Sequence, residues 1–420
     1  MNLLTTRRFL PLFITQFLGA LNDNLFKNAL VMLVTFKLAP ATGENAQALV
    51  TMAAALFILP YFLFSATAGQ VADMFDRAAV ARVTKIVEII VVGVGAAGFY
   101  LNNPYFLLFV LFCLGVQATF FGPVKYALLP QHLRDDELLA GNGYIEAGTF
   151  LAILLGTIAG GLLILQPAGE TLISAAMLAV ALVGYIASRF IPPAPSAGHI
   201  KKINWNIFSE TWKIIQHDRK NPRVFTCIIA ISWFWLAGAT FLSQFPAYAK
   251  DVLHGDETVV TLLLVLFSLG IGAGSMLCSA LLKGQIKSTF VPYAALGLAI
   301  TAGDVYFASN LPPYTGENLL TAFQFMAMPQ HFRVMFDLFA FALCGGVFIV
   351  PLYAIMQHDS DPEFRARTIA TNNIINALFM VIAAVATLLM LNEGFSVPQV
   401  FLAMAIGNAA VAVYLFVRKG

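Results

Sequence analysis

Long apolar stretches separated by short polar segments recur along the whole chain. Twelve of them are long enough to cross a bilayer, because a helix rises about 1.5 Å per residue and the hydrocarbon core is about 30 Å thick. The expected spans are 9–36, 46–72, 80–100, 105–129, 138–165, 171–190, 224–248, 258–282, 288–308, 334–356, 369–391 and 397–417. This pattern predicts an all-α integral membrane protein with twelve transmembrane helices in two pseudo-symmetric six-helix bundles.

A polar segment after the sixth span divides the chain into residues 1–190, a cytoplasmic linker at 191–222 and residues 223–420. Two matches support an internal repeat: GPVKYALLPQH, from Gly122 to His132, resembles VPLYAIMQH, from Val350 to His358. In the same order, AGNGYIE from residue 140 resembles ATNNIIN from residue 370. Repeated halves are typical of secondary transporters, whose substrate sites lie where the halves meet.

The linker contains an amphipathic pattern. Trp205, Phe208, Trp212 and Ile215 recur at helical spacing, which predicts a helix with one apolar side. Two placements remain open: on the inner surface of the membrane, or packed against neighbouring cytoplasmic loops.

Composition agrees with a membrane protein. Hydrophobic residues make up 59% of the chain and charged residues 11%, with a formal net charge of +2, so nothing indicates nucleic-acid binding. Lys and Arg outside the spans gather on one side, which predicts that both termini are cytoplasmic. The four cysteines stand alone in apolar segments, the histidines show no metal-ligand clustering, and no nucleotide-binding or nucleophile motif occurs. We therefore expect neither a metal nor another cofactor, and no enzymatic activity.

The first span carries the strongest candidate site. Its sequence QFLGALNDNLFKN places Asp23, Asn24 and Lys27 inside an apolar helix. Ionised groups at this depth are costly and by default mark function. The alternative is that Asp23 and Lys27, one helical turn apart, neutralise each other and only lock helix packing.

A second candidate lies at the inner ends of the fourth and fifth spans. Lys125 follows a helix-bending Pro123, and Glu146 lies at similar depth one turn from Asn142. Lys125 could supply a cation for a phosphate, or Lys125 and Glu146 could form a salt bridge that holds the two helices together.

Two further acids stand alone in the sequence. Glu88 in the third span and Asp304 near the outer end of the ninth have no obvious partner. Glu88 could serve proton coupling.

The substrate class follows from the distribution of polarity. Charged residues inside spans lie mostly in the first half, whereas the seventh span contains Trp233, Phe234 and Trp235 in a row. A cavity with one charged and one apolar wall suits an amphipathic molecule such as a zwitterionic phospholipid, whose phosphate would meet a lysine and whose ammonium would meet an acid.

The loop between the second and third spans resembles a family motif. Gly69, Asp73 and Arg77 match the first, fifth and ninth positions of G-x-x-x-D-R-x-G-R-[KR], the signature of the major facilitator superfamily, although Met74 and Asp76 replace its first arginine and second glycine. In this family the motif is a conformational latch, and Asp73 with Arg77 would form a charge pair that breaks when the halves rock.

Most of the chain is similar to the bacterial lysophospholipid transporter family and to the transporter domain fused to 2-acylglycerophosphoethanolamine acyltransferase. The likeness is carried by QFLGALNDNLFKNAL, FFGPVKYALLPQHL, LLAGNGYIEAGTFLAILLGTIAGG and FIVPLYAIMQ. It implies inward flipping of lysophosphatidylethanolamine-like lipids across the bacterial inner membrane by alternating access, for re-acylation by a separate acyltransferase. By the same resemblance, Asp23, Lys125, Asn142 and Glu146 match the family's motif residues. At Leu242 the chain departs from some members, which carry a basic residue there.

Two other functions fit the same features. One is proton-coupled export of drugs or other hydrophobic solutes, with Asp23 or Glu88 carrying the proton. The other is a non-transporting membrane scaffold that recruits an acyltransferase through the linker.

Overall fold

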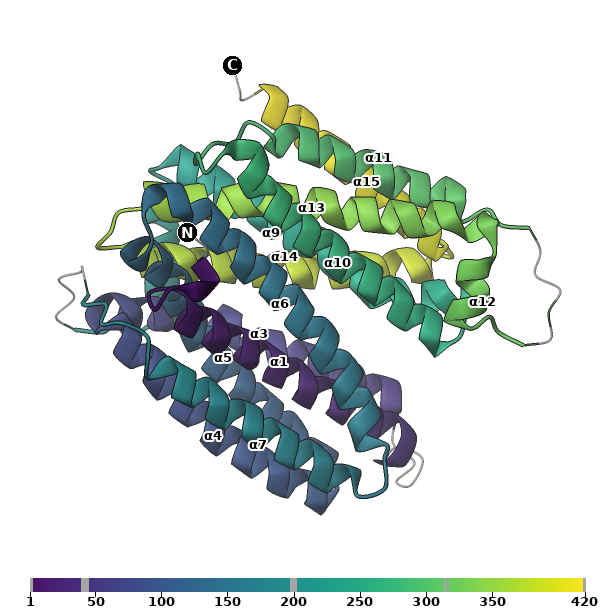
Figure 1. The fold of residues 1–420 in the computed structure, drawn as a ribbon, viewed down its shortest axis with the longest axis horizontal. Coiled ribbons are helices and arrows are strands. Elements are labelled where there is room, and N and C mark those ends of the chain that lie inside the picture. The colour runs from purple at the N-terminus through teal and green to yellow at the C-terminus, as the bar shows by residue number, and fades with distance from the viewer. Residues whose placement is uncertain (1–2, 39–44, 197–201, 313–315, 317, 418–420) are drawn as a thin grey trace. The chain divides into compact units, whose positions relative to one another are not determined.

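The computed structural model describes residues 3–417 apart from 39–44, 197–201, 313–315 and 317 (Figure 1). Within these residues the fold is helical, with twelve helices of 18 residues or more. They are α1 (Leu10–Leu33), α3 (Ala46–Met74), α4 (Arg77–Leu101), α5 (Pro104–His132), α6 (Asp135–Ile164), α7 (Gly169–Ser188), α9 (Pro222–Ala247), α10 (Glu257–Leu282), α11 (Val291–Ala308), α13 (Phe332–Asp359), α14 (Arg365–Asn392) and α15 (Val397–Val417). Two shorter helices are α8 (Ile207–Asp218) and α12 (Ala322–Ala327).

These long helices match the twelve expected spans in order and approximate extent, which confirms the predicted all-α fold class. In the described part of the chain, ten of them have the length and hydropathy needed to cross a membrane. The structure adds one or more turns at several helix ends. α14, for example, begins at Arg365, four residues before the predicted start.

Polar residues set where several helices begin. Asn or Asp side chains accept a hydrogen bond from a backbone N–H of the first turn, which satisfies a donor that has no partner inside the helix. The capping residues are Asn45 for α3, Asp76 for α4, Asn103 for α5, Asn206 for α8 and Asp256 for α10.

The chain forms two compact units. Unit 1 contains residues 1–141, 151–225 and 356–377, and unit 2 contains residues 142–150, 226–355 and 378–420. These units differ from the predicted bundles at 142–150 and 356–377, and the division at 1–190 and 223–420 stays a prediction.

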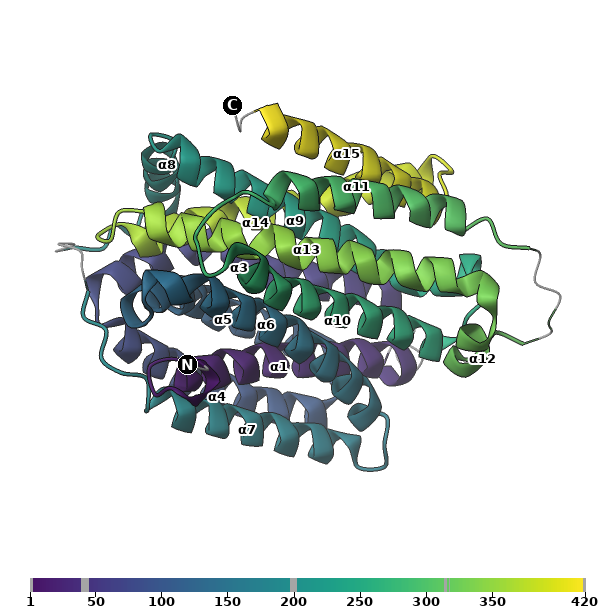
Figure 2. The same ribbon diagram turned by 45° about the horizontal axis from the view of Figure 1, so that its top comes forward.

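Unit 1 is built around close helix pairs. α4 and α7 run side by side in both views (Figures 1 and 2), α3 packs on α5, and α1 packs on α7. Phe26 is fully buried at the centre of an apolar cluster, with its ring centroid 5.3 Å from that of Phe99. Gly156 and Gly160 of α6 lie against the α1 backbone, where an added Cβ would be 2.6 Å from the Leu21 carbonyl oxygen and 2.5 Å from that of Leu25. The glycines thus allow the close helix contact.

Unit 2 has an aromatic core. The Phe241 ring stacks between Phe341 and Phe401 at centroid distances of 4.3 and 4.2 Å. The indole N–H of Trp233 donates to Asn408 at 2.8 Å, and that of Trp235 donates to the Tyr353 hydroxyl at 3.1 Å. The indole N–H groups of these half-buried rings are therefore satisfied, as expected for Trp in an apolar environment.

A short π-helical segment continues the first long helix of each predicted half. Val34–Leu38 follows α1, and Tyr248–Val252 follows α9. π-helical turns are rare, so their occurrence at matching places supports the internal repeat.

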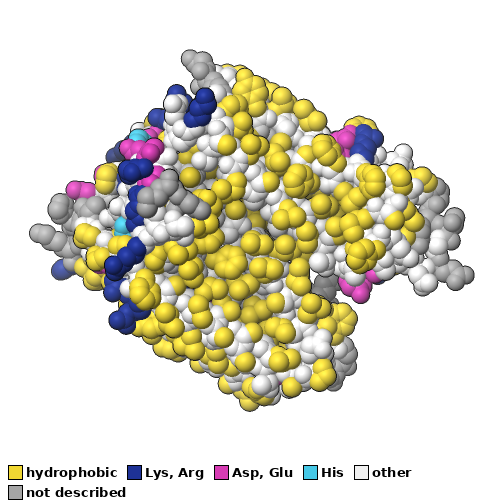
Figure 3. Space-filling model, viewed as in Figure 1, with side chains coloured by type: hydrophobic (Ala, Val, Ile, Leu, Met, Phe, Trp, Pro, Cys, Tyr) yellow, Lys and Arg dark blue, Asp and Glu magenta, His cyan; other side chains and the backbone are white. Residues whose placement is uncertain are grey.

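On the face shown in Figure 3, hydrophobic side chains cover most of the surface. Large exposed apolar residues are numerous, among them Leu162, Ile300 and Val413 at 61, 62 and 63% exposure. An apolar exterior of this kind fits a lipid environment.

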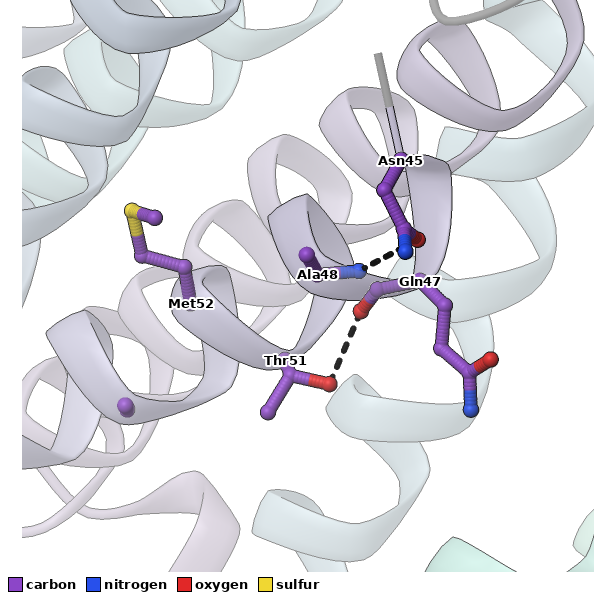
Figure 4. A pocket seen from close by; sticks show the side chains of 6 residues that line it. Asn45, Gln47, Ala48, Thr51 and Met52 are labelled. Carbon is purple, nitrogen blue, oxygen red and sulfur yellow. Dashed lines mark hydrogen bonds between the residues drawn. The ribbon is translucent and has the colours of Figure 1, made fainter.

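The start of α3 borders a hollow lined by Asn45, Gln47, Ala48, Thr51, Met52 and Ala55 (Figure 4). Asn45 accepts from the Ala48 N–H at 3.1 Å, and the Thr51 hydroxyl donates to the Gln47 carbonyl at 2.8 Å. These polar groups serve the helix itself, and the hollow contains none of the predicted site residues.

Candidate functional site

The polar stretch of α1 keeps its helical form because its amides bond to the helix backbone. The Asn24 side chain donates to the Ala20 carbonyl at 2.8 Å. Asn28 donates to the Asn24 carbonyl at 2.9 Å and to the Thr157 hydroxyl of α6 at 3.1 Å. The amide donors are thus satisfied locally and fix α1 against α6.

Asp23 has a different environment. Its side chain is half-buried, and its Oδ1 is buried without a hydrogen-bond partner among the described residues. Lys27 points its ammonium towards the Phe57 ring, 5.8 Å from the centroid. In the part of the chain that the structure describes, no direct ion pair joins Asp23 to Lys27. The Asp23 carboxylate therefore has acceptor capacity left for a ligand.

The expectation that Glu88 stands alone is wrong. Glu88 is fully buried, and its carboxylate accepts from the Lys85 ammonium at 2.5 Å. It also accepts from Asn22 of α1 at 3.1 Å and from Gln117 of α5 at 3.2 Å. Lys85 is itself fully buried, with its ammonium 5.7 Å from the Phe121 ring centroid. We call Asn22, Lys85, Glu88 and Gln117 the Glu88 cluster.

The Glu88 cluster fixes the rotation of α1. Asn22 points towards α4, and the next residue, Asp23, is turned about 100° around the helix axis. The opposite charges of Lys85 and Glu88 compensate each other, as buried ions require. The charges of the cluster are thus balanced, whereas the neighbouring Asp23 carboxylate has a buried oxygen without a hydrogen-bond partner among the described residues.

The residues of the second candidate site fall into different units. Lys125 belongs to unit 1, where its ammonium lies 4.5 Å from the Tyr126 ring centroid. Asn142 and Glu146 are fully buried in α6 and belong to unit 2. The salt bridge between Lys125 and Glu146 stays a prediction.

The loop motif lies at a charge cluster in unit 1. Asp73 accepts from Arg77 at 3.0 Å, from the backbone N–H groups of Ala366 and Arg367 at 3.1 and 3.2 Å, and from the Arg367 guanidinium at 3.1 Å. Ala366 and Arg367 are in the first turn of α14, so the carboxylate binds the positive end of that helix. Asp73 and Arg77 are both fully buried. We call Asp73, Arg77 and Arg367 the Asp73 cluster.

Gly69 allows this contact. A Cβ at Gly69 would be 2.9 Å from the Arg367 Cα and 2.9 Å from the Ala370 Cβ. Only a glycine lets α3 approach α14 this closely.

Sequence reasoning missed Lys85, Gln117 and Arg367. Lys85 is three residues before Glu88, a spacing that brings side chains together on a helix, so that pair was detectable. Arg367 is 294 residues from Asp73, and no local signal connects them.

A second acid also has a partner that was not expected. Asp304 of α11 accepts from the Arg333 guanidinium of α13, with Nε at 3.0 Å from Oδ2. This corrects the interpretation of Asp304 as a single acid.

Comparison with known proteins decides the family. The model of the Major Facilitator Superfamily matches residues 12–317. The chain belongs to the major facilitator superfamily. Among relatives in this superfamily, the Lysophospholipid transporter LplT of Escherichia coli O7:K1 (strain IAI39 / ExPEC) is 26% identical over 367 residues, which cover 86% of this chain and 83% of the relative. LplT of Shigella boydii serotype 4 (strain Sb227) is also 26% identical, with the same coverage.

Solved structures of superfamily members share the fold. The human organic anion transporter MFSD10 (TETRAN) aligns with a TM-score of 0.77 at 12% identity, covering 97% of this chain and 98% of the other. The proton:xylose symporter XylE aligns with a TM-score of 0.70 at 13% identity, covering 97 and 95%. At such low identity these likenesses show the architecture and nothing about cargo.

Proposed function

We propose that this superfamily transporter carries lysophospholipids, flipping a lysophosphatidylethanolamine-like lipid from the outer to the inner leaflet of a bacterial inner membrane by alternating access. The relatives named as lysophospholipid transporters support the cargo. The observation in the structure that carries the proposal is the Asp23 carboxylate, an acid in a membrane-spanning helix with an oxygen that no described residue bonds. An ammonium head group would supply the missing donor.

The remaining site residues complete the proposed head-group site. Lys27 and Lys125 would bind the phosphate; the Lys27 ammonium lies 5.8 Å from the Phe57 ring centroid, and the Lys125 ammonium lies 4.5 Å from that of Tyr126. Asn24, Asn142 and Glu146 would add polar contacts. The coupling role of Glu88 stays a prediction. The three hydrogen-bond donors to its carboxylate favour another role, in which Glu88 holds α1 in position.

The Asp73 cluster would act as the inner latch. It ties the end of α3 to the start of α14 through one buried carboxylate. Alternating access requires such ties to break and re-form during each cycle. Gly69, Asp73 and Arg77 would therefore govern the rate of the cycle and leave head-group affinity unchanged.

The decisive experiment is uptake of radiolabelled lysophosphatidylethanolamine into inverted or right-side-out vesicles from cells that lack other lysolipid transporters. Asp23→Asn should reduce uptake about tenfold or more, since hydrogen bonds to charged groups contribute about 1.5–3 kcal/mol. Glu393→Gln, the same change at an exposed residue outside the site, is the matched control and should behave as the unchanged protein. Equal uptake by both variants at equal abundance would contradict the proposal.

The same assay separates the competing functions. Flipping that persists after the proton gradient is collapsed contradicts a proton-coupled exporter. A scaffold predicts that Asp23→Asn with Lys125→Ala leaves lipid re-acylation in cells unchanged, whereas a carrier predicts its loss.

Re-acylation, orientation and domain organisation complete the proposal. The flipped lysolipid would become the substrate of a separate acyltransferase, so label should enter diacyl lipid only when that enzyme is present. Both termini would be cytoplasmic, which reporter fusions at either end can test. Residues 1–190 and 223–420 would form the two rocking bundles, joined by the linker at 191–222.

A further inference from the structure

The two sides of α8 differ in what they contact. Glu210, Ile214 and Asp218 follow one another at intervals of four residues, and they are 1, 0 and 3% exposed. Ile214 packs in an apolar cluster with Ala66, Phe364, Ala370 and Ile374. One side of the short linker helix is thus buried against α3 and α14.

Polar contacts hold α8 in place at both ends. Before the helix, the Asn204 carbonyl accepts from the Gln70 side-chain Nε2 at 3.1 Å, and the Asn204 backbone N–H donates to the Gln70 side-chain Oε1 at 2.8 Å. At the other end, Asp218 accepts from the Thr368 hydroxyl at 2.8 Å. The helix is therefore a fixed platform.

The opposite side presents aromatic residues to the outside. Trp205, Phe208 and Trp212 are 74, 79 and 65% exposed. Trp205 lies two residues before α8, and Phe208 and Trp212, four residues apart, lie on one side of the helix. We call these three residues the α8 aromatic face. α8 has 12 residues, far fewer than the about 20 needed to cross a bilayer, so these side chains are not explained by a transmembrane position.

Charge on α8 is sorted by side. Within residues 202–220, both acids, Glu210 and Asp218, are buried. The exposed charged residues are all basic: Lys202, Lys213, Arg219 and Lys220. The exposed side thus combines large aromatic rings with positive charge only.

The position in the chain brings the end of α8 close to a membrane. The candidate span containing α9 begins at Pro222, four residues after α8 ends. Trp side chains favour the membrane–water interface, and basic residues near the surface attract anionic lipids.

We propose that the α8 aromatic face binds the anionic phospholipid surface of the bilayer in which the protein is embedded. The rings insert at head-group level, and Lys202, Lys213, Arg219 and Lys220 contact phosphate groups. This proposal is independent of the transported cargo. It resolves the two placements expected for the linker helix, because one side packs on the protein and the other faces lipid.

This contact would bear on the Asp73 cluster. The His217 ring stacks on Phe364 at a centroid distance of 3.7 Å, and the Arg367 guanidinium lies 3.8 Å from the same ring. Lipid bound to one side of α8 therefore steadies the residues that support Arg367. Anionic lipid is expected to favour the state in which Asp73 is bonded to Arg77 and Arg367.

Tryptophan fluorescence tests the proposal in the full-length protein. The chain has four Trp residues, and Trp233→Phe with Trp235→Phe leaves only Trp205 and Trp212. In nanodiscs of phosphatidylglycerol brominated near the head group, the emission of this variant should be blue-shifted and quenched by bromine. In nanodiscs of brominated phosphatidylcholine the quenching should be smaller, and aqueous acrylamide should quench more.

A charge variant checks the electrostatic part. Lys213→Glu should weaken the apparent affinity for phosphatidylglycerol about fivefold or more, because about 1 kcal/mol is lost with one basic side chain near an anionic surface and the added carboxylate repels the lipid. The matched control is Lys250→Glu, an exposed basic residue after the seventh expected span and so on the opposite side of the membrane, which should change nothing.

Emission that stays water-exposed and equally sensitive to acrylamide in all nanodiscs would overturn the proposal. So would quenching that is identical in phosphatidylglycerol and phosphatidylcholine and unaffected by Lys213→Glu. If the variant with Trp233→Phe and Trp235→Phe fails to fold, a second variant with Trp205→Phe and Trp212→Phe is used. Subtracting its emission from that of the unchanged protein gives the emission of Trp205 and Trp212.

Discussion

Glu88 lies where three helices of unit 1 meet. Asn22 comes from α1, Lys85 from α4 itself and Gln117 from α5, and all of them donate to one carboxylate. In an apolar interior the hydrogen bonds of such a network strengthen one another. Loss of one member therefore affects the others.

Removal of one charge from the Glu88 cluster should destabilise the protein strongly. Glu88→Ala leaves the Lys85 ammonium buried without its counter-ion, at a cost of about 3–5 kcal/mol. Thermal unfolding in detergent, followed with a thiol-reactive dye at the buried cysteines Cys227 and Cys278, should show a lower midpoint.

Two controls accompany this measurement. Lys85→Met combined with Glu88→Leu removes both charges and should recover much of the loss. Asp136→Ala breaks an ion pair with Arg134 in which both side chains are 68% exposed, and such pairs contribute at most about 1 kcal/mol. A midpoint equally low for Asp136→Ala and Glu88→Ala would contradict the buried-charge argument.

Asp218 gives the α8 contact a pH dependence. Burial raises the pKa of its carboxyl, while hydrogen bonds from Thr371 and Thr368 act in the opposite direction. A carboxyl whose pKa is raised in the folded state stabilises the fold most below its unfolded pKa, and this contribution is lost as pH rises through the folded pKa.

The expected result is that unchanged protein loses stability relative to Asp218→Asn as pH rises from about 4. Unfolding midpoints of the two proteins across this range measure the difference. Glu393→Gln, at an exposed position, should show no such trend, and a trend of opposite sign would refute the assignment to Asp218.

At the scale of elements, α3 and α14 are joined by close backbone approach and by charge. Gly69 provides the approach, and Asp73 bonds both the first turn of α14 and the Arg367 side chain. A helix start binds an anion through its free N–H groups. The contact therefore uses backbone as much as side chain.

Weakening the Asp73 cluster should expose the α3–α14 contact. Ala370 is fully buried there, so a cysteine at this position in a cysteine-free background should react slowly with a water-soluble maleimide. Arg367→Ala or Asp73→Asn should accelerate labelling several-fold, because the charge-assisted bonds are lost.

Arg82→Ala serves as the control for labelling. Arg82 forms a more distant pair with Asp76 at 3.9 Å, with both side chains about one-third exposed, and its loss should leave the rate unchanged. Unaltered labelling in the Arg367 and Asp73 variants would show that these charges do not close the contact.

Helices were the most predictable elements. Apolar windows of about 20 residues identify spans, and Asn45, Asp76 and Asn103 precede helix starts as their capping chemistry requires. The amphipathic pattern of the linker also identified α8. Its sequence could not reveal which side is buried, because Ile214 contacts residues about 150 positions away in α14.

At the scale of the whole molecule, the fold class and the family follow from hydropathy, repeats and the loop motif. The site follows only in part. Asp23 was identifiable because an acid in an apolar helix is rare, whereas Arg367 joins Asp73 through tertiary contact alone. The charge of Lys85 alone would predict a position near water. Lys85 is buried because the Glu88 carboxylate, one helical turn away, compensates its charge.

Unit 1 draws on three separate stretches of chain: 1–141, 151–225 and 356–377. A break in the backbone between residues 198 and 199 would therefore leave neither fragment able to complete it alone. The second fragment would carry α8, and the Gln70 clamp on Asn204 offers it a docking place on the first. Co-expressed fragments should thus be purified together as one particle through a tag on either fragment. Packing between the fragments would then replace the peptide bond that joins them in the intact chain.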